Sequence, residues 1–318
     1  MTRVRSFRLY DTGFFLDKEN KFYCLSNRTR FTNNQFSLTN CFLDSLNLVN
    51  PGSIAVSLGM HMSYYWGGQV SFDVKNATAW FDWLISGKNS NNSNLLELLE
   101  YFVNEAGQEG MHNCAVSLDE GHWVTSSFRQ NGFGVYAKQS VWKYDGDYHD
   151  EMTEFWQLVT PAPFDEYDRF YESQITPLIR KLGSNWTQGN IYALKREGEI
   201  LATAKATADS NRKSIYLEPI FHPGAENPAR LLFGLVNTLI SSVKCDIHVL
   251  VPGFQAWVID SYRSEGYFPV CNQIIYVKKL TAPVVDEVPV LAIEKGTLQT
   301  AGPTNIQINQ EENEPLRE

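Results

Sequence analysis

A stretch near the end of the chain repeats an earlier one at a constant separation. Residues 251–280 read VPGFQAWVIDSYRSEGYFPVCNQIIYVKKL, and moving them back by 134 residues places them over residues 118–144. The matched positions are Trp123/Trp257, Val124/Val258, Phe128/Tyr262, Arg129/Arg263, Gly132/Gly266, Phe133/Tyr267, Gln139/Gln273 and Val141/Ile275. Such a period is too long for a solenoid and predicts two tandem domains of one fold.

Each copy of the repeat reads as a helix, a turn and a strand. In the second copy, Phe254, Val258 and Tyr262 recur every four residues, which is typical of a helix buried on one face. Gly266 follows at the position where a left-handed residue closes a helix most easily. The apolar residues of 270–277 then predict a strand.

The motif Tyr-x-x-x-Gly-Tyr at residues 262–267 resembles the last helix of the GNAT acyltransferase superfamily, whose pattern runs roughly Ala-x-x-x-x-Tyr-x-x-x-Gly-Phe. The resemblance in organisation covers nearly all of residues 1–280, and its specific residues lie in the two repeated stretches. It implies an α/β (α+β) fold of two tandem GNAT-like domains, each with a mixed central β-sheet flanked by helices.

The repeat and the composition divide the chain into three parts. We expect an N-terminal GNAT-like domain over residues 1–146 and a C-terminal one over 147–280, which begins with a helical linker at 147–190. Residues 281–318 hold four prolines and seven acidic residues against Lys295 and Arg317. This composition buries too little apolar surface to offset chain entropy, so it predicts a disordered acidic tail.

Apolar periodicity predicts the elements of each domain. In the first domain, the expected strands lie at 4–10, 53–58, 68–75, 79–85, 112–118 and 134–143. The other expected features there are helix and loop at 14–49, a turn at Gly67-Gly68, and helices starting from an N-cap at Asn94 and over 121–131. In the second domain they are a hairpin of 191–195 and 199–207, a strand at 214–220, and a helix opened by Asn227-Pro228.

Composition and spacing exclude several classes of protein. No apolar run approaches the roughly 20 residues that span a bilayer, and arginines interrupt the N-terminus where a signal peptide would be apolar, so we expect a cytoplasmic protein. The basic residues are scattered, which argues against a nucleic-acid partner. The histidines lack ligand spacing, so no metal site is expected. Cys114 and Cys245 open apolar strands and should be buried free thiols.

The resemblance implies where a cofactor would bind. In the family, acyl-coenzyme A lies in a wedge between two splayed parallel strands, and a loop of the form Gln/Arg-x-x-Gly-x-Gly/Ala holds its pyrophosphate at a helix N-terminus. The corresponding segments here are 87–93, GKNSNNS, and 222–230, HPGAENPAR. The second has a carboxylate at Glu226 and lacks one N–H at Pro228, so only Lys88 in the first segment or Arg230 in the second could add positive charge.

By this resemblance, an acetyl-CoA site in the second domain would use Leu217, Ile220, His222, Gly224, Ala225, Asn227 and Arg230. Tyr262 stands where the family places a tyrosine that protonates the departing thiolate, whereas Phe128 in the first copy has no proton to donate. Glu218 would be the base that deprotonates the amine, with Asp82 on the comparable strand of the first domain. Alternatively, Tyr262 fills a core position and Glu218 points outward from a strand edge.

Four tryptophans belong to these stretches. Trp123 and Trp257 are expected to be core residues that dock a helix on the sheet. Trp80 and Trp83 would face opposite sides of a strand, so that at least one meets the partner domain or a ligand.

Two hypotheses of different class follow. In the first, the C-terminal half transfers an acetyl or acyl group from coenzyme A to a small-molecule amine, and the N-terminal half is inactive. In the second, the protein is a non-catalytic GNAT-fold module that senses a ligand or binds a protein. The N-terminal half could act as a lid in either. The enzyme requires at least three free, convergent N–H groups in the 222–230 loop. The sequence sets no expectation for the oligomeric state.

Overall fold

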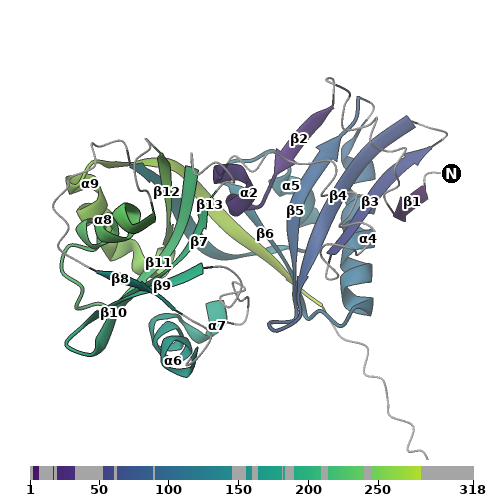
Figure 1. The fold of residues 1–318 in the computed structure, drawn as a ribbon. Helices are drawn as coiled ribbons and strands as arrows, with labels where there is room; N and C mark the ends of the chain where they lie inside the picture. Colours follow the sequence, from purple (N-terminus) through teal and green to yellow (C-terminus); the bar gives the residue numbers. More distant parts are fainter. Residues whose placement is uncertain are drawn as a thin grey trace, which may run out of the picture. The chain divides into compact units, whose positions relative to one another are not determined.

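The structure, a computed structural model, describes most of the chain up to Leu280 (Figure 1). The described residues are 3–6, 17, 20–32, 53–60, 63–88, 90–144, 155–159, 164–180, 182, 190–208, 214–239 and 245–280. The expected disordered tail, 281–318, lies outside the described residues.

The strands of both halves form one continuous sheet. Its order is β1 (Arg3–Ser6), β3 (Ser53–Met60), β4 (Ser63–Asp73), β5 (Thr78–Ser86), β6 (Asn113–Asp119), β13 (Tyr267–Lys279), β7 (Gly134–Tyr144), β12 (Asp246–Pro252), β11 (Ser214–Phe221), β10 (Glu199–Ala208), β9 (Asn190–Arg196) and β8 (Trp156–Leu158). A further strand, β2 (Lys21–Cys24), pairs with β5 beside this path. The sheet is mixed, since β5/β6 and β11/β12 are parallel pairs within a largely antiparallel order.

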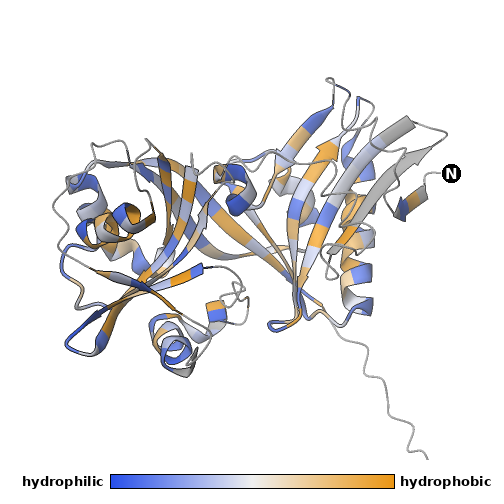
Figure 2. Cartoon of the chain, in the orientation of Figure 1, coloured by the Kyte–Doolittle hydropathy of each residue, from blue (hydrophilic) through white to orange (hydrophobic). Residues whose placement is uncertain are grey.

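Helices cover this sheet. They are α2 (Asn27–Phe31), α4 (Asn92–Gln108), α5 (Thr125–Gln130), α6 (Phe164–Gln174), α7 (Pro177–Arg180), α8 (Pro228–Leu239), the 3-10 helix η2 (Gly253–Val258) and α9 (Ile259–Ser264). One large apolar cluster lies beneath α4 and α5 in the first half, and a second lies beneath α8 and α9 in the second half. Hydrophobic and hydrophilic residues alternate along the strands in between, as Figure 2 shows.

The predicted repeat is present in the structure. Val124 and Val258 are both buried, and so are Phe128 and Tyr262. The turn glycines that close the two helices have φ angles of +89° at Gly132 and +84° at Gly266, a region that favours glycine. The same helix–turn–strand unit therefore occurs twice.

The two halves exchange their last strands. β13, from the second half, lies between β6 and β7 of the first, and β7 lies between β13 and β12 (Figure 1). Gln139 pairs directly with Gln273, its own counterpart in the repeat. The register slips at Tyr136 on one strand and at Val270 on the other, and these two residues are also counterparts. A local two-fold axis consequently passes between the two glutamines.

The expected helix that packs on the first sheet is α4, and its apolar residues are buried as predicted. Its N-cap is Asn91 rather than Asn94, because the Asn91 side chain accepts a hydrogen bond from the Asn94 N–H at 2.8 Å. The turn predicted at Gly67-Gly68 is wrong, since both glycines lie inside β4. A Cβ on Gly68 would come within 2.9 Å of Leu84, so glycine there permits close packing.

The tryptophans differ most from expectation. Trp123 and Trp257 are not core residues, because 50% and 44% of their surfaces are exposed. Trp80 and Trp83 share one face of β5, since a bulge at Asp82 shifts the alternation between them. Trp80 packs against an apolar cluster that contains Leu182, which follows the linker helix α7.

Other expectations are confirmed. Cys114 and Cys245 are buried free thiols. The predicted helical linker contains the short helices α6 and α7, but Trp156–Leu158 within it form strand β8. The hairpin turns at Glu197-Gly198, where both residues have positive φ. Residues 20–32 contain β2 and α2, where the sequence predicted helix and loop but no strand.

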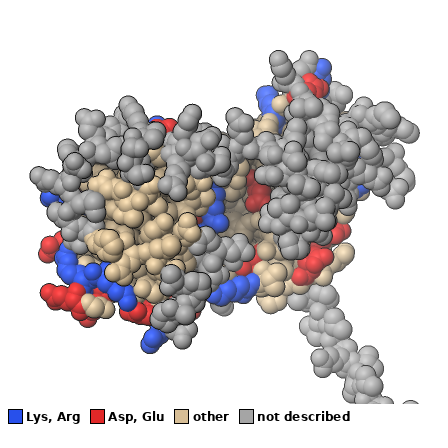
Figure 3. All heavy atoms as spheres, viewed as in Figure 1, with Lys and Arg blue, Asp and Glu red and all other residues tan. Residues whose placement is uncertain are grey.

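The surface of the described residues carries mixed charge. On the face seen in Figure 3, basic and acidic side chains lie close to one another beside a broad uncharged area. Among the helices described, none is both long enough and apolar enough to cross a bilayer.

The exchanged strands make a prediction about the two halves, whose boundary at residues 146 and 147 is itself still a prediction. Residues 1–146 and 147–280, produced as separate chains, would each lose a central strand neighbour and expose apolar sheet edges. We expect each fragment to aggregate or self-associate alone, and the two to form a one-to-one complex when refolded together. Light scattering after size exclusion measures this, and two monomeric fragments that each unfold cooperatively would contradict it.

Candidate functional site

Each half contains a parallel strand pair that separates into a wedge. In the N-terminal half, β5 and β6 pair only at residues 78–80 and 113–115. Strand β2 then takes the edge of β5 at residues 83–86, and the Leu25 and Ser26 N–H groups donate to the Asp82 carbonyl at 2.8 and 3.0 Å. Because β4 already occupies the other edge of β5, β2 must fill the wedge.

In the wedge of the C-terminal half, the described part of the chain provides no such strand. Here β11 and β12 pair at residues 214–217 and 246–249, and β10 covers the opposite edge of β11. Beyond Leu217, no described strand pairs with β11 on the wedge side. The buried side chain of Gln255 closes the far end, since its amide donates to the Phe221 carbonyl at 2.8 Å and accepts from the Phe221 N–H at 3.3 Å. Between the last β11/β12 pair at Leu217 and the Gln255 contact at Phe221, residues 218–220 form a strand edge on the wedge side that no described strand covers.

Corresponding positions near the wedge carry charge in one half alone. On β4 and β5, Gln69 and Trp83 are cross-strand partners, joined by a hydrogen bond of 2.6 Å from the indole to the amide. The equivalent partners on β10 and β11 are Lys205 and Glu218. The first half has a neutral pair where the second has two ionisable groups.

Glu218 lies in a charged cluster with Lys205 and Arg28 of α2. The Arg28 Nε is 3.1 Å from a Glu218 carboxylate oxygen, and 16% of the Glu218 side chain is exposed. Lys205 is fully buried, which lowers the pKa of its amine to about 8, although Glu218 partly opposes that shift. Sequence reasoning missed Lys205, whose signal was a single charge within the small-residue run ATAKATA.

The loop before α8 uses most of its N–H groups internally. The Gly224 N–H donates to the His222 imidazole at 3.0 Å, and the Ala225 N–H donates to the His222 carbonyl at 2.9 Å. The Ala229 N–H donates to the Ser261 hydroxyl at 3.1 Å, and the Arg230 N–H donates to the Asn227 carbonyl at 3.0 Å.

An asparagine–serine contact ties this loop to the last helix in both halves. The Ser261 hydroxyl donates to the Asn227 side chain at 2.7 Å, and Asn227 donates to Glu265 at 2.7 Å. In the first half, the Ser127 hydroxyl donates to Asn92, and Asn92 donates to Gln130 at 3.0 Å. The backbone of Asn227 is left-handed, with φ +45°. Its counterpart Asn92 is instead the first residue of α4 and follows Asn91, whose backbone is extended.

The residues expected at the cofactor site are only partly brought together. His222, Gly224 and Asn227 are exposed in the loop, Arg230 is exposed in the first turn of α8, and Ala225 is buried in the loop. Leu217 and Ile220 pack in different apolar clusters, because three positions separate them on β11 and they point to opposite faces.

Tyr262 lies in the interior. Its side chain is fully buried and stacks on Tyr267 at 4.9 Å, and its hydroxyl has no hydrogen-bond partner among the described residues. Burial, with a smaller contribution from Tyr267, raises the pKa of the phenol well above its usual value. Tyr262 packs in the cluster that contains Leu217, whereas Glu218 points to the other face of β11. The general-acid role stays a prediction, and a ligand would have to reach this enclosed hydroxyl.

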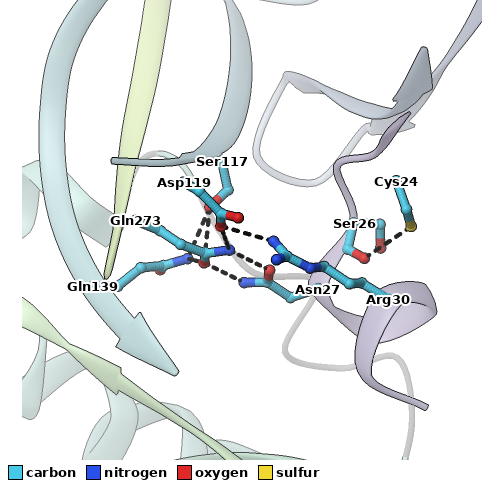
Figure 4. Close-up of polar contacts among 8 residues, drawn as sticks. All are labelled: Cys24, Ser26, Asn27, Arg30, Ser117, Asp119, Gln139 and Gln273. Atoms are coloured by element: carbon cyan, nitrogen blue, oxygen red, sulfur yellow. Dashed lines mark hydrogen bonds and ion pairs between the residues drawn. The ribbon is translucent and has the colours of Figure 1, made fainter. Parts of the chain in front are cut away.

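A second polar cluster surrounds the local two-fold axis (Figure 4). Gln273 is 2% exposed and exchanges two hydrogen bonds of 2.8 Å with Asn27 of α2. Its carbonyl also accepts from Gln139 at 2.9 Å and from Ser117 at 3.2 Å, and its amide donates to Asp119 at 3.1 Å. The matched glutamines of the repeat were the sequence signal for this cluster, which sequence reasoning did not use.

Helix α2 joins both halves at this point. Arg30 donates to Asp119 of the first half at 2.7 Å, while Arg28 pairs with Glu218 of the second. Burial alone would raise the pKa of Asp119, but the hydrogen bonds from Arg30 and Gln273 outweigh it and lower that pKa.

The substitution Gln273→Leu should destabilise the whole sheet. It leaves Asn27, Gln139 and Asp119 without their buried partner, which should cost about 2–4 kcal/mol of unfolding free energy. Denaturant unfolding measures this loss, and Asn272→Ala on the exposed side of β13 is the matched control. Equal stability of the two variants would show that the cluster does not join the halves.

The substitution Lys205→Met should stabilise the protein near neutral pH, because the fold disfavours the charged amine. Between pH 8 and the ordinary lysine value of 10.5, the unfolded chain holds a proton that the folded chain has lost, so wild-type stability rises with pH relative to the variant. Paired unfolding curves across this range should show the advantage of the variant shrinking. A pH-independent difference would contradict the lowered pKa.

Comparisons with known proteins agree with this architecture. No family model matches the chain, and no curated protein matches its sequence. Its structure is similar to a tandem GNAT protein from the clavulanic acid biosynthesis pathway, with 13% identity, a TM-score of 0.51, and coverage of 82% of this chain and 98% of that one. It is also similar to a GCN5-related N-acetyltransferase from Sphaerobacter thermophilus, with 10% identity, a TM-score of 0.52, and coverage of 82% and 96%.

At these identities the likeness concerns the fold. The fold is identified by three observations: the helix–turn–strand unit occurs twice, each half has a splayed parallel strand pair, and the structural neighbours share this architecture. The chain has the tandem GNAT fold, with a large mixed sheet flanked by helices.

Proposed function

We propose that the C-terminal half binds an acyl-coenzyme A and transfers its acyl group to a small-molecule amine. The difference between the two wedges carries this proposal. Strand β2 fills the first wedge, whereas the β11 edge from Glu218 to Ile220 has no strand partner among the described residues. The ionisable pair Lys205 and Glu218 also lies beside the second wedge and not the first.

In this proposal, the loop before α8 would rearrange to hold the coenzyme phosphates. The Gly224 and Ala229 N–H groups are held by side chains, those of His222 and Ser261, which can rotate away. With the N–H groups of Glu226 and Asn227, they would offer several donors at the N-terminus of α8, where the helix dipole favours an anion. The left-handed Asn227 supports this reading, because such strained positions gather at ligand sites.

When bound, coenzyme A supplies an acyl group activated as a thioester. Glu218 would accept the proton of the amine once the amine replaces Arg28 as its partner. Tyr262, kept protonated by its burial, would donate a proton toward the sulfur, and its hydroxyl would thereby gain a partner that it does not have among the described residues. Orientation of the two reactants would supply much of the remaining rate.

A second candidate is a non-catalytic ligand-sensing or protein-interaction module. The internal bonding of the loop favours it, because four N–H groups there already have acceptors. The Glu226 carboxylate and the Arg28–Glu218 ion pair favour it too, since one repels phosphate and the other occupies the proposed base.

Titration calorimetry with acetyl-CoA decides between the two. We expect binding by the wild type, tighter binding by Glu226→Gln, and normal binding by Tyr262→Phe with at least tenfold slower acyl transfer, about 1.4 kcal/mol of barrier. Release of free thiol in the presence of a panel of small amines measures the transfer.

The repeat supplies a matched control for the location of the site. Asn227→Asp places a carboxylate at the N-terminus of α8 and should abolish coenzyme binding, whereas Asn92→Asp in the first half should leave it unchanged. Absence of heat with the wild type at millimolar acetyl-CoA would reject the enzyme and leave the non-catalytic module. Loss of binding in Asn92→Asp alone would place the site in the other half.

A further inference from the structure

The N-terminal half contains its own example of an occupied wedge. Strand β2 lies in that wedge as an extended chain, and Tyr23 on β2 packs against the exposed indole of Trp123, with ring centroids 5.3 Å apart and an angle of 62°. Trp123 also packs on Trp66 of β4 at 5.8 Å. Trp123, which precedes α5, therefore contacts strand β2, the segment that fills this wedge.

Trp257 occupies the equivalent place in the C-terminal half. It precedes α9 as Trp123 precedes α5, and in both copies the next residue is a buried valine. Two residues earlier, Gln255 reaches the β11 edge at Phe221, which places this segment at the wedge. Yet 44% of Trp257 is exposed, and the aromatic contacts found among the described residues include none with its ring.

The position equivalent to Trp66 is also smaller in the second half. The Gly87 N–H donates to the Tyr65 carbonyl, and the His222 N–H donates to the Leu201 carbonyl, so Ala202 corresponds to Trp66. Trp123 has three aromatic neighbours, Tyr23, Trp66 and His122, and among the described residues none of them has an aromatic equivalent beside Trp257. The second wedge therefore has a tryptophan, Trp257, but among the described residues it has no equivalent of the aromatic side chains that cover Trp123.

We propose that Trp257 is a ligand-binding residue, whose indole packs on the pantetheine arm of the coenzyme in the C-terminal wedge. This rests on the proposed function. The arm is an extended chain with two amides and a dimethyl-substituted carbon, so it can follow the path that β2 takes in the first half. The indole face offers an apolar surface to the dimethyl group, as Trp123 does to Tyr23.

The strand edge favours this occupant over a peptide. Pro219 stands where β5 has Leu84, so it offers a carbonyl without an N–H group. Gln255 already uses both backbone groups of Phe221. A peptide strand needs alternating donors and acceptors along its partner, whereas a single carbonyl suffices for one pantetheine amide.

Affinity measurements on a matched pair of variants test the inference. By titration calorimetry with acetyl-CoA, Trp257→Ala should bind roughly tenfold more weakly than the wild type, and Trp257→Phe should retain most of the affinity. Trp123→Ala should bind normally and have a lower melting temperature, because Tyr23 and Trp66 lose a packing partner. Acetyl-CoA should quench tryptophan fluorescence in the wild type and in Trp123→Phe, and much less in Trp257→Phe.

The outcomes separate the inference from the function on which it rests. Equal affinity of Trp257→Ala and wild type would overturn the contact and leave the acyltransferase standing. No binding by the wild type would overturn both. If instead a peptide with the sequence of residues 20–26 binds in a Trp257-dependent manner and acetyl-CoA does not, the occupant is an extended peptide and the proposal is wrong.

Discussion

The pairing of β7 with β13 is the constraint on which the rest of this structure depends. Each of these strands belongs to one half of the chain and completes the sheet of the other. Because Gln139 meets its own counterpart Gln273, the register of this pair also fixes the local two-fold axis. An error of one residue would invert every side chain of both strands, so the buried glutamines and their polar partners also specify the register.

The symmetric frame supports two unlike halves. The first half uses residues 21–24 as a strand that fills its wedge, where the second half has the helices α6 and α7 at the corresponding point of the chain. Helix α2, which follows that strand, then contacts the second half through Arg28. The segment that closes one wedge therefore also contributes a charged group beside the other.

The sequence predicted the parts of this fold that depend on local pattern. The repeat, the turn glycines and the hairpin at Glu197-Gly198 follow from periodicity and from backbone preference. Strand β2 could not be predicted, because its partner on β5 lies about 60 residues away and its four residues carry little pattern of their own. Trp123 and Trp257 were misassigned because size and apolarity indicate burial, whereas a large part of both side chains is exposed. Arg28 and Lys205 join Glu218 only through tertiary contact, so spacing along the chain could not bring them together.

The central claim is that one wedge is closed by the chain itself while the other receives a ligand. Hydrogen exchange followed by mass spectrometry, with and without acetyl-CoA, tests it most directly. The account predicts slower amide exchange in residues 215–232 and at 253–260 on adding the coenzyme, with residues 20–26 and 78–95 unchanged. Protection confined to the first half, or no protection at saturating coenzyme, would contradict it.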